Sequence, residues 1–184
     1  MRLVIFILVG LFLFSGSAFS IDSIELFTGY LGAPLQEKHD LRVVPLMLAI
    51  NFDSNGFVKE KMGIDVSGEL NFALEPFINP VISPDNNIEV GVNFLFKYVL
   101  PFGEDFKTYI KGGLGVLYMS QHTREQSTQY NFLPQAGMGV SYRISEKAAI
   151  NFEYRYRHLS NAGFESPNKG IDANMFLTGI QFLF

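Results

Sequence analysis

Apolar and polar residues alternate along most of this chain, and this period of two is the feature that most limits its fold. Between 150 and 158, Ile150, Phe152, Tyr154 and Tyr156 fall on one face, while an asparagine, a glutamate and two arginines fall on the other. Such alternation is typical of a β-strand with one apolar and one polar face. The same pattern recurs in the segments 64–74, 88–98, 108–118 and 132–144, and in a last strand that ends at Phe184.

Two earlier segments, 24–31 and 41–52, carry apolar residues on both faces, and Pro45 interrupts the second. With them the chain has eight predicted strands. Because the polar faces of the clear strands carry charges, bringing them together produces a polar interior and an apolar exterior. A transmembrane β-barrel has this arrangement, and it must close because an open edge in hydrocarbon leaves backbone groups unsatisfied. We predict an all-β fold, an eight-stranded antiparallel transmembrane β-barrel with an interior filled by side chains.

The charged faces argue against a soluble β-sandwich, which shares an apolar core between two sheets and shows its charges outside. Inside a barrel they are expected to pair. The predicted members of these pairs are Glu69, Glu89, Glu153, Lys97, Arg155 and Arg157. If the first strand starts in the periplasm, the outside loops are 32–40, 75–87, 119–129 and 159–173, and the periplasmic turns are 53–61, 100–105 and 145–147.

The start of the chain predicts export. Arg2 precedes an apolar run from Leu3 to Phe14, and small residues follow, so we expect a signal peptide over residues 1–20. The apolar run is shorter than the ~20 residues that a membrane helix needs. The remaining chain, 21–184, is expected to form one domain. The whole sequence has no cysteine for disulfide or thiol chemistry, and its formal charge of −4 makes it a poor candidate for binding nucleic acid.

Polar residues with catalytic chemistry follow the strand 150–158. By the parity of that strand, His158 and Ser160 emerge on the lipid-facing side, and Asp172 returns beside them on the last strand. Residues two apart on a strand lie roughly 6–7 Å apart, so a slightly bent chain brings imidazole and hydroxyl within reach. A base beside a hydroxyl, held by a carboxylate, activates a nucleophile. The other interpretation is an interfacial histidine followed by ordinary turns.

The C-terminal run RHLSNAGFESPNKGIDANMFLTGIQFLF resembles the signature of the lipid A 3-O-deacylase (PagL) family of outer-membrane acyl hydrolases. The family pattern is an aromatic strand, H-x-S-N-A-G, P-N-x-G-I, an acidic residue and a final strand. The clear match covers about thirty residues. The matching positions are His158, Ser160, Asn161, Ala162, Gly163, Pro167, Asn168, Gly170, Ile171 and Asp172.

The resemblance implies that Ser160 is the nucleophile, that His158 is the general base and then acid, and that Asp172 orients the histidine. The family usually has glutamate at this last position, and aspartate is one methylene shorter. The resemblance also implies that Asn168 and Asn161 stabilise the oxyanion. The implied activity is hydrolysis of the ester-linked 3-hydroxyacyl chain of lipid A, a serine esterase reaction that needs no metal or cofactor.

The apolar wall beside these residues, with Phe152, Tyr154 and Tyr156, is expected to contact the acyl chain. The expected location is the bacterial outer membrane, where lipopolysaccharide is the substrate and outer-membrane lipids are the surroundings. Two alternatives stay open: a non-enzymatic barrel acting as an anchor or adhesin, and a phospholipase or acyltransferase with the same lipid-facing site. Acyl-chain selectivity and the oligomeric state, a homodimer included, are also open.

Overall fold

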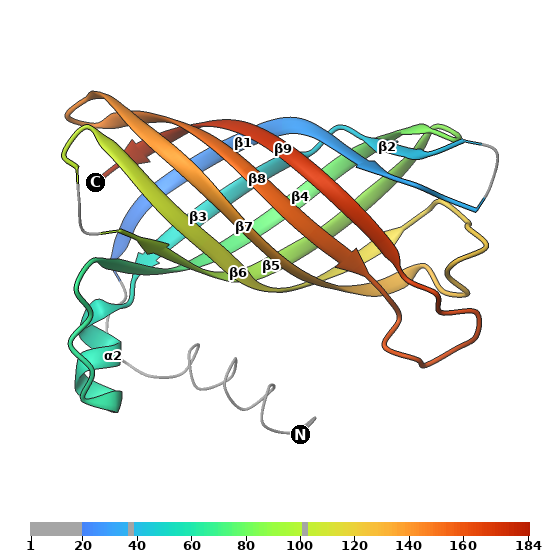
Figure 1. Cartoon of the computed structure of the whole chain (residues 1–184), viewed down its shortest axis with the longest axis horizontal. Helices are drawn as coiled ribbons and strands as arrows, with labels where there is room; N and C mark the ends of the chain where they lie inside the picture. Colours follow the sequence, from blue (N-terminus) through green and yellow to red (C-terminus); the bar gives the residue numbers. More distant parts are fainter. Residues whose placement is uncertain (1–19, 37–38, 101–102) are drawn as a thin grey trace.

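The computed structural model describes residues 20–36, 39–100 and 103–184, and the predicted signal peptide, 1–20, lies outside them except for its last residue. The described chain is an antiparallel barrel with one helix at one end (Figure 1). The elements are β1 (Ile21–Ala33), β2 (Leu41–Val43), β3 (Leu46–Asp53), α2 (Asn55–Met62), β4 (Glu69–Ser83), β5 (Asn87–Val99), β6 (Phe106–Met119), β7 (Tyr130–Ser145), β8 (Ala148–Leu159) and β9 (Ile171–Leu183).

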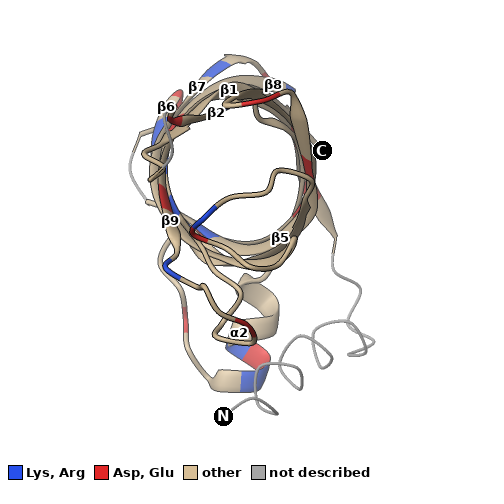
Figure 2. Cartoon of the chain, turned by 90° about the vertical axis from the view of Figure 1, so that its right-hand side faces the viewer, with Lys and Arg blue, Asp and Glu red and all other residues tan. Residues whose placement is uncertain are grey.

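From β3 to β9 each strand pairs with the next in the sequence, and β1 pairs with β9, so the sheet closes on itself (Figure 2). The short β2 and β3 both pair with β1 and with β4, and they share one position in the wall, separated at Val44–Pro45. The nine strands of the described chain therefore occupy eight positions, which confirms the predicted eight-stranded barrel and the interruption at Pro45. No helix among the described residues is long and apolar enough to cross a membrane.

The predicted bounds were wrong for the strand 64–74 and for the two connections on either side of it, 53–61 and 75–87. Residues 75–83, predicted as an outside loop, continue β4 and carry Pro76 and Pro80 within the strand. The missing N–H groups are tolerated where the neighbouring strand is itself broken: Val44 N donates to Pro80 O at 2.9 Å, and Leu46 N donates to the side chain of Asn79. The stretch predicted as the turn 53–61 and the start of a strand at 64 contains α2 and the loop after it.

A network of charged side chains, here called the central network, fills the middle of the interior. Arg155 donates to Glu75 at 2.7 Å and pairs with Glu153, and Lys111 lies 2.9 Å from Glu75 and 3.1 Å from Glu153. Lys97 pairs with Glu25. The three acids and three bases balance in charge and have exposed fractions of 3% or less. Beside them Arg157 binds Glu89 through two contacts, so five of the six predicted interior charges are buried in pairs.

The interior of the barrel near the loops 120–129 and 160–170, here called the loop end, is apolar, which the sequence analysis did not predict. The opposite end, which holds Ile21 and Phe184, is called the terminal end. Its side chains come from the loop-end halves of the strands and form one buried cluster. The members include Leu31, Leu41, Val43, Val81, Met119, Leu133, Leu159, Ile171 and Met175. This cluster explains why the segments 24–31 and 41–52 are apolar on both faces: one face meets the exterior and the other meets this core.

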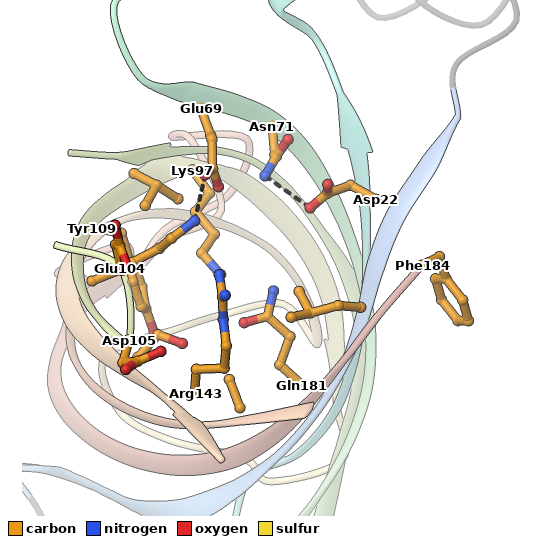
Figure 3. A pocket seen from close by; sticks show the side chains of 15 residues that line it. Asp22, Glu69, Asn71, Lys97, Glu104, Asp105, Tyr109, Arg143, Gln181 and Phe184 are labelled. Atoms are coloured by element: carbon orange, nitrogen blue, oxygen red, sulfur yellow. Dashed lines mark hydrogen bonds and ion pairs between the residues drawn. The ribbon is translucent and has the colours of Figure 1, made fainter. Parts of the chain in front are cut away.

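The sixth predicted interior charge, Glu69, lies elsewhere. It sits at the mouth of the barrel on the terminal end, with a side chain that is 53% exposed and paired with Lys107. Figure 3 shows this mouth as a small polar pocket of about 170 Å³, with Asp22, Lys97 and Arg143 on its wall. Because the side chains of Lys107 and Glu69 are 28% and 53% exposed, their ion pair is far less desolvated than the pairs of the central network.

Candidate active site

The pairing of β8 with β9 places His158 directly opposite Asp172. Opposite residues in an antiparallel pair share a face, and both side chains point outward, 39% and 57% exposed. The Nδ1 atom of His158 lies 2.6 Å from Oδ1 of Asp172. An ionised carboxylate only accepts hydrogen bonds, so Nδ1 carries the proton of the neutral ring and Nε2 keeps a free lone pair. The hydroxyl of Tyr156 interacts with the same carboxylate.

Ser160 is positioned by an isolated bridge to β7 just beyond the end of β8. Its backbone N–H donates to Phe132 O at 3.1 Å, and its carbonyl accepts from Phe132 N at 2.8 Å. Phe132 points outward, so Ser160 shares the outer wall with His158 and Asp172, as its parity predicts. Within the described chain no hydrogen bond joins Ser160 Oγ to His158. Catalytic hydrogen bonds are often long before substrate binds.

Gly170 packs against the imidazole ring and was not singled out from the sequence as a site residue. Its φ of +78° is in the left-handed region, and a Cβ placed there would lie 2.4 Å from Cε1 of His158. Glycine is therefore required for two reasons: the backbone has a left-handed φ, and a Cβ would collide with the ring. The motif contains this glycine, but only the fold shows which side chain it touches.

The loop 160–170 is held by the neighbouring loop 120–129. Gln126 forms an isolated bridge with Asn168, Ser127 N donates to Pro167 O at 3.0 Å, and Lys169 N donates to Glu125 O at 2.9 Å. These contacts give an irregular loop the hydrogen-bond partners that a strand neighbour would supply. No periodicity in the sequence indicates them, so the contribution of 125–127 to the site was missed.

Asn161 is the buried centre of the loop, with only 1% exposed. Its Nδ2 donates to Ser127 Oγ at 3.1 Å and to Glu165 O at 2.9 Å, and its Oδ1 accepts from Gly163 N at 2.9 Å. Both amide hydrogens of the side chain are therefore already used. Asn168 differs, because its Oδ1 accepts from Asn161 N at 3.0 Å and its Nδ2 makes no hydrogen bond within the described chain.

Apolar side chains surround the polar groups on the outer wall. The rings of Phe132 and Phe164 are tilted against each other, with centroids 6.2 Å apart, next to Ser160, and neither was predicted as a site residue. Toward the terminal end, an apolar groove of about 660 Å³ crosses β6 to β9 and is lined by Phe152, Tyr154 and Phe176 among others. Two of the three predicted acyl-chain contacts thus line this groove, whereas Tyr156 lies above it, next to Asp172.

The chemistry available here is that of an imidazole, a carboxylate, a hydroxyl and amides. Among the described residues, no group of three or more His, Asp and Glu side chains is arranged to hold a metal ion. A carboxylate–imidazole pair beside a hydroxyl can perform acyl transfer, and here the pair lies on the outer wall of the barrel.

Known structures share the fold. The chain is similar to the crystal structure of the outer-membrane enzyme PagL, with 17% identity, 85% of this chain and 97% of that chain covered, and a TM-score of 0.62. It is also similar to Neisserial surface protein A, with 12% identity, 88% and 96% covered, and a TM-score of 0.65. The N-terminal barrel of OprF from Pseudomonas aeruginosa has 14% identity, 89% and 98% covered, and a TM-score of 0.51. These likenesses show an outer-membrane barrel fold.

A search of curated proteins found no match. The family model described as lipid A 3-O-deacylase (PagL) matches residues 46–181, a span that contains His158, Ser160 and Asp172. Because this match covers well over half of the sequence, the chain belongs to the lipid A 3-O-deacylase (PagL) family of outer-membrane proteins.

Proposed function

We propose that this protein is an outer-membrane lipid A 3-O-deacylase, a serine esterase that hydrolyses the ester-linked 3-hydroxyacyl chain of lipid A. The observation that carries the proposal is the outward pair of His158 and Asp172, joined at 2.6 Å, with Ser160 on the same wall. A polar pair in contact with lipid is costly to keep without a role, because hydrocarbon offers it no other partners. Membership of the deacylase family supports the same chemistry.

In the proposed acylation step, Ser160 Oγ attacks the ester carbonyl of the acyl chain. The hydroxyl proton passes to Nε2 of His158, the nitrogen left free because Asp172 holds Nδ1. As the tetrahedral intermediate collapses, the bond from the acyl carbon to the sugar oxygen breaks. His158 returns the proton to that oxygen, so the sugar leaves as an alcohol and the acyl chain stays on Ser160.

The second step repeats this sequence with water. His158 takes a proton from water, and the resulting hydroxide attacks the acyl carbon. The bond from that carbon to Ser160 Oγ then breaks, and His158 returns the proton to Oγ. The products are a free 3-hydroxy fatty acid and the regenerated enzyme. Both steps pass through an oxyanion, which requires donors in fixed positions. We assign this role to Nδ2 of Asn168, whereas Asn161, with its side-chain hydrogens already used, positions Asn168 through its backbone N–H.

The apolar groove below the site suits the acyl chain. It begins within a few residues of His158 along β8 and contains Phe152 and Tyr154. An acyl chain lying there remains in apolar surroundings while its ester meets the polar groups above, so binding requires no transfer of the chain into water. The pair Phe132 and Phe164 borders Ser160 on the other side.

Mass spectrometry of lipid A from bacteria that express the wild type, Ser160→Ala or Ser67→Ala tests the proposal. Ser67 is a matched control because it is an exposed serine near the terminal end, far from the site. Wild type and Ser67→Ala should remove one 3-hydroxyacyl mass, and Ser160→Ala should be slower by on the order of 10⁴-fold or more. Heat-modifiable migration in gels should show all three barrels folded.

Each other outcome contradicts part of the proposal. Deacylation by folded Ser160→Ala would remove the nucleophile role from Ser160. Intact lipid A with all three variants, together with new lysophospholipids, would make the protein a phospholipase. Intact lipid A and intact phospholipids would favour a non-enzymatic barrel.

A further inference from the structure

The helix α2 occupies an unusual position for a connection at the terminal end of the barrel. Figure 2 looks along the barrel and shows α2 outside the ring of strands, and Figure 1 shows it at the level of the terminal mouth, running across the barrel axis rather than along it. In an outer-membrane barrel whose longer loops face outward, this end is periplasmic. The helix therefore lies beside the wall, at the level where the inner leaflet of the membrane meets the periplasm.

The helix is tied firmly to the barrel by polar contacts at its start. Ser54 Oγ accepts from Phe72 N at 3.1 Å, and Asn55 Oδ1 accepts from Leu70 N at 2.7 Å. The Nδ2 of Asn55 donates to Gly68 O at 2.6 Å, which also closes the loop after the helix. The position of α2 beside the wall is thus a fixed feature of the fold rather than the result of a free tether.

Two large apolar side chains of this segment, Met62 and Ile64, are mostly exposed. None of the residues of α2 is buried, although Val58 and Met62 are four apart and share one face of the helix. Met62 is 64% exposed, and Ile64, which follows the left-handed Gly63, is 50% exposed. Large apolar side chains so close together on a short projecting segment are typical of a surface that binds something apolar.

The surface continues an established lipid-facing band. Phe52 and Phe72 stack at 6.5 Å, and Phe72 and Phe96 meet edge to face at 5.7 Å. These rings come from the ends of β3, β4 and β5 nearest α2 and point away from the interior. Aromatic rows of this kind mark the interfaces of membrane barrels. An apolar segment beside such a row, at the same end of the wall, faces the headgroup region of the inner leaflet.

The charges of the segment identify the kind of contact. Lys59 pairs with Asp65 at 3.3 Å, and Lys61 pairs with Glu60, so two bases balance two acids. Attraction to anionic lipid therefore contributes little, and the lysine stems can lie along the interface with their charged ends in water. We propose that the segment 55–66, with α2 at its centre, binds the phospholipid of the inner leaflet by inserting Met62 and Ile64 at the boundary of headgroups and acyl chains.

The chain contains no tryptophan, so single-tryptophan variants report on one position each. The purified full chain is reconstituted into phosphatidylcholine vesicles that contain brominated phosphatidylcholine, and tryptophan quenching by bromine is measured. The variants are Met62→Trp and Ile64→Trp, with Glu60→Trp as the matched control, because Glu60 is two residues from both Val58 and Met62 and so lies on the other side of the helix. Leu114→Trp, in the middle of the lipid-facing wall of β6 and opposite Phe94, is 43% exposed and reports correct insertion.

We expect Met62→Trp and Ile64→Trp to emit at shorter wavelength than Glu60→Trp and to be quenched by bromine. Bromines placed high on the acyl chain should quench them more than bromines near its end, and Leu114→Trp should show the reverse order. Because insertion is apolar, high salt should leave the quenching unchanged.

Quenching of Met62→Trp no stronger than that of Glu60→Trp, in vesicles where Leu114→Trp is quenched, would overturn the proposal. Protection of Met62→Trp from both bromine and aqueous acrylamide would also overturn it, because a protein contact would then cover the segment. Quenching abolished by salt would contradict apolar insertion. The test does not involve deacylation, so it stands or fails separately from the proposed function.

Discussion

The central network and the pair of His158 and Asp172 use similar chemistry on opposite sides of one strand. On β8, Arg155 faces inward and binds Glu75 and Glu153 with almost no exposure, while His158 faces outward with 39% of its side chain exposed. Inside, each charge has several partners, and the whole is neutral. Outside, the imidazole has one carboxylate and a free nitrogen. Side chains whose polar atoms are all paired stabilise a fold, whereas a side chain with an unpaired polar atom has that atom available for chemistry.

The largest expected effect is on the outer pair. Asp172→Asn should lower kcat by about 10⁴-fold, because an amide no longer enforces the proton on Nδ1 and the ring presents the wrong nitrogen to Ser160. The midpoint of thermal unfolding should stay close to that of the wild type, since the asparagine side chain can still form a hydrogen bond with the ring. Kinetics on lipid A in mixed micelles measures the first quantity and circular dichroism the second.

Two controls sharpen this result. Asp105→Asn removes an exposed carboxylate near the terminal mouth and should leave kcat unchanged. Asp172→Glu supplies the residue that the family usually carries and should retain most of the activity. Full activity of Asp172→Asn would exclude a role for the carboxylate in catalysis.

Breaking the central network should lower stability and leave activity unchanged, the opposite of the result expected for Asp172→Asn. Arg155→Met leaves Glu75 and Glu153 buried with Lys111 as their remaining base, and should lower the free energy of unfolding by about 3–5 kcal/mol. Urea unfolding in detergent micelles checks this value, with the exposed Lys147→Met as control. Activity per folded molecule should persist. An unchanged stability would mean that water relieves the buried acids, and the contrast between inside and outside would then be wrong.

A third prediction concerns the packing of the imidazole ring. Gly170→Ala places a methyl group against His158 and should lower kcat by about 10²-fold, the cost of displacing a catalytic group by roughly 1 Å. Gly163→Ala is the matched control, because Gly163 has the same φ of +78° and a Cβ added there would have nothing within 4 Å. Both variants should lose similar stability. Equal losses of kcat would show that backbone strain, and not contact with the ring, is responsible.

The smallest expected effect lies in the loop that supports Asn161. Ser127→Ala removes one hydrogen bond to Nδ2 of Asn161 and should cost about 0.5–1.5 kcal/mol, or about a two- to tenfold loss of kcat/KM. Thr128→Ala is the neighbouring control, since that hydroxyl bonds to the carbonyl of Tyr130 instead. If the two variants are equally active, the loop 120–129 does not position the oxyanion donor.

The sequence predicted those parts of the fold where the two faces of a strand differ. In β8 the alternation fixes which residues face outward, and the pairing of His158 with Asp172 follows from parity and a single connection. The alternation could not predict that β4 continues through Pro76 and Pro80, because this continuation depends on the break in the neighbouring strand at Pro45.

Other features depend on contacts between segments far apart in the chain. The apolar interior at the loop end makes strands apolar on both faces, which removes the alternation that would reveal them. The contact between Ser127 and Asn161 joins two irregular loops, and the contact between Gly170 and His158 depends on a left-handed backbone. The motif and the alternation of apolar and polar residues predict which residues carry the chemistry, but not which neighbouring residues hold them in place.

Under the proposed function, the outward position of His158 and Asp172 also decides how substrate is supplied. A molecule that reaches this wall arrives by lateral diffusion in the leaflet, so the encounter rate depends on the number of substrate molecules per unit area of membrane. Adding inert lipid to a vesicle lowers that surface density, while adding buffer around the vesicle leaves it unchanged. Turnover by such a site is therefore a function of mole fraction in two dimensions rather than of molar concentration.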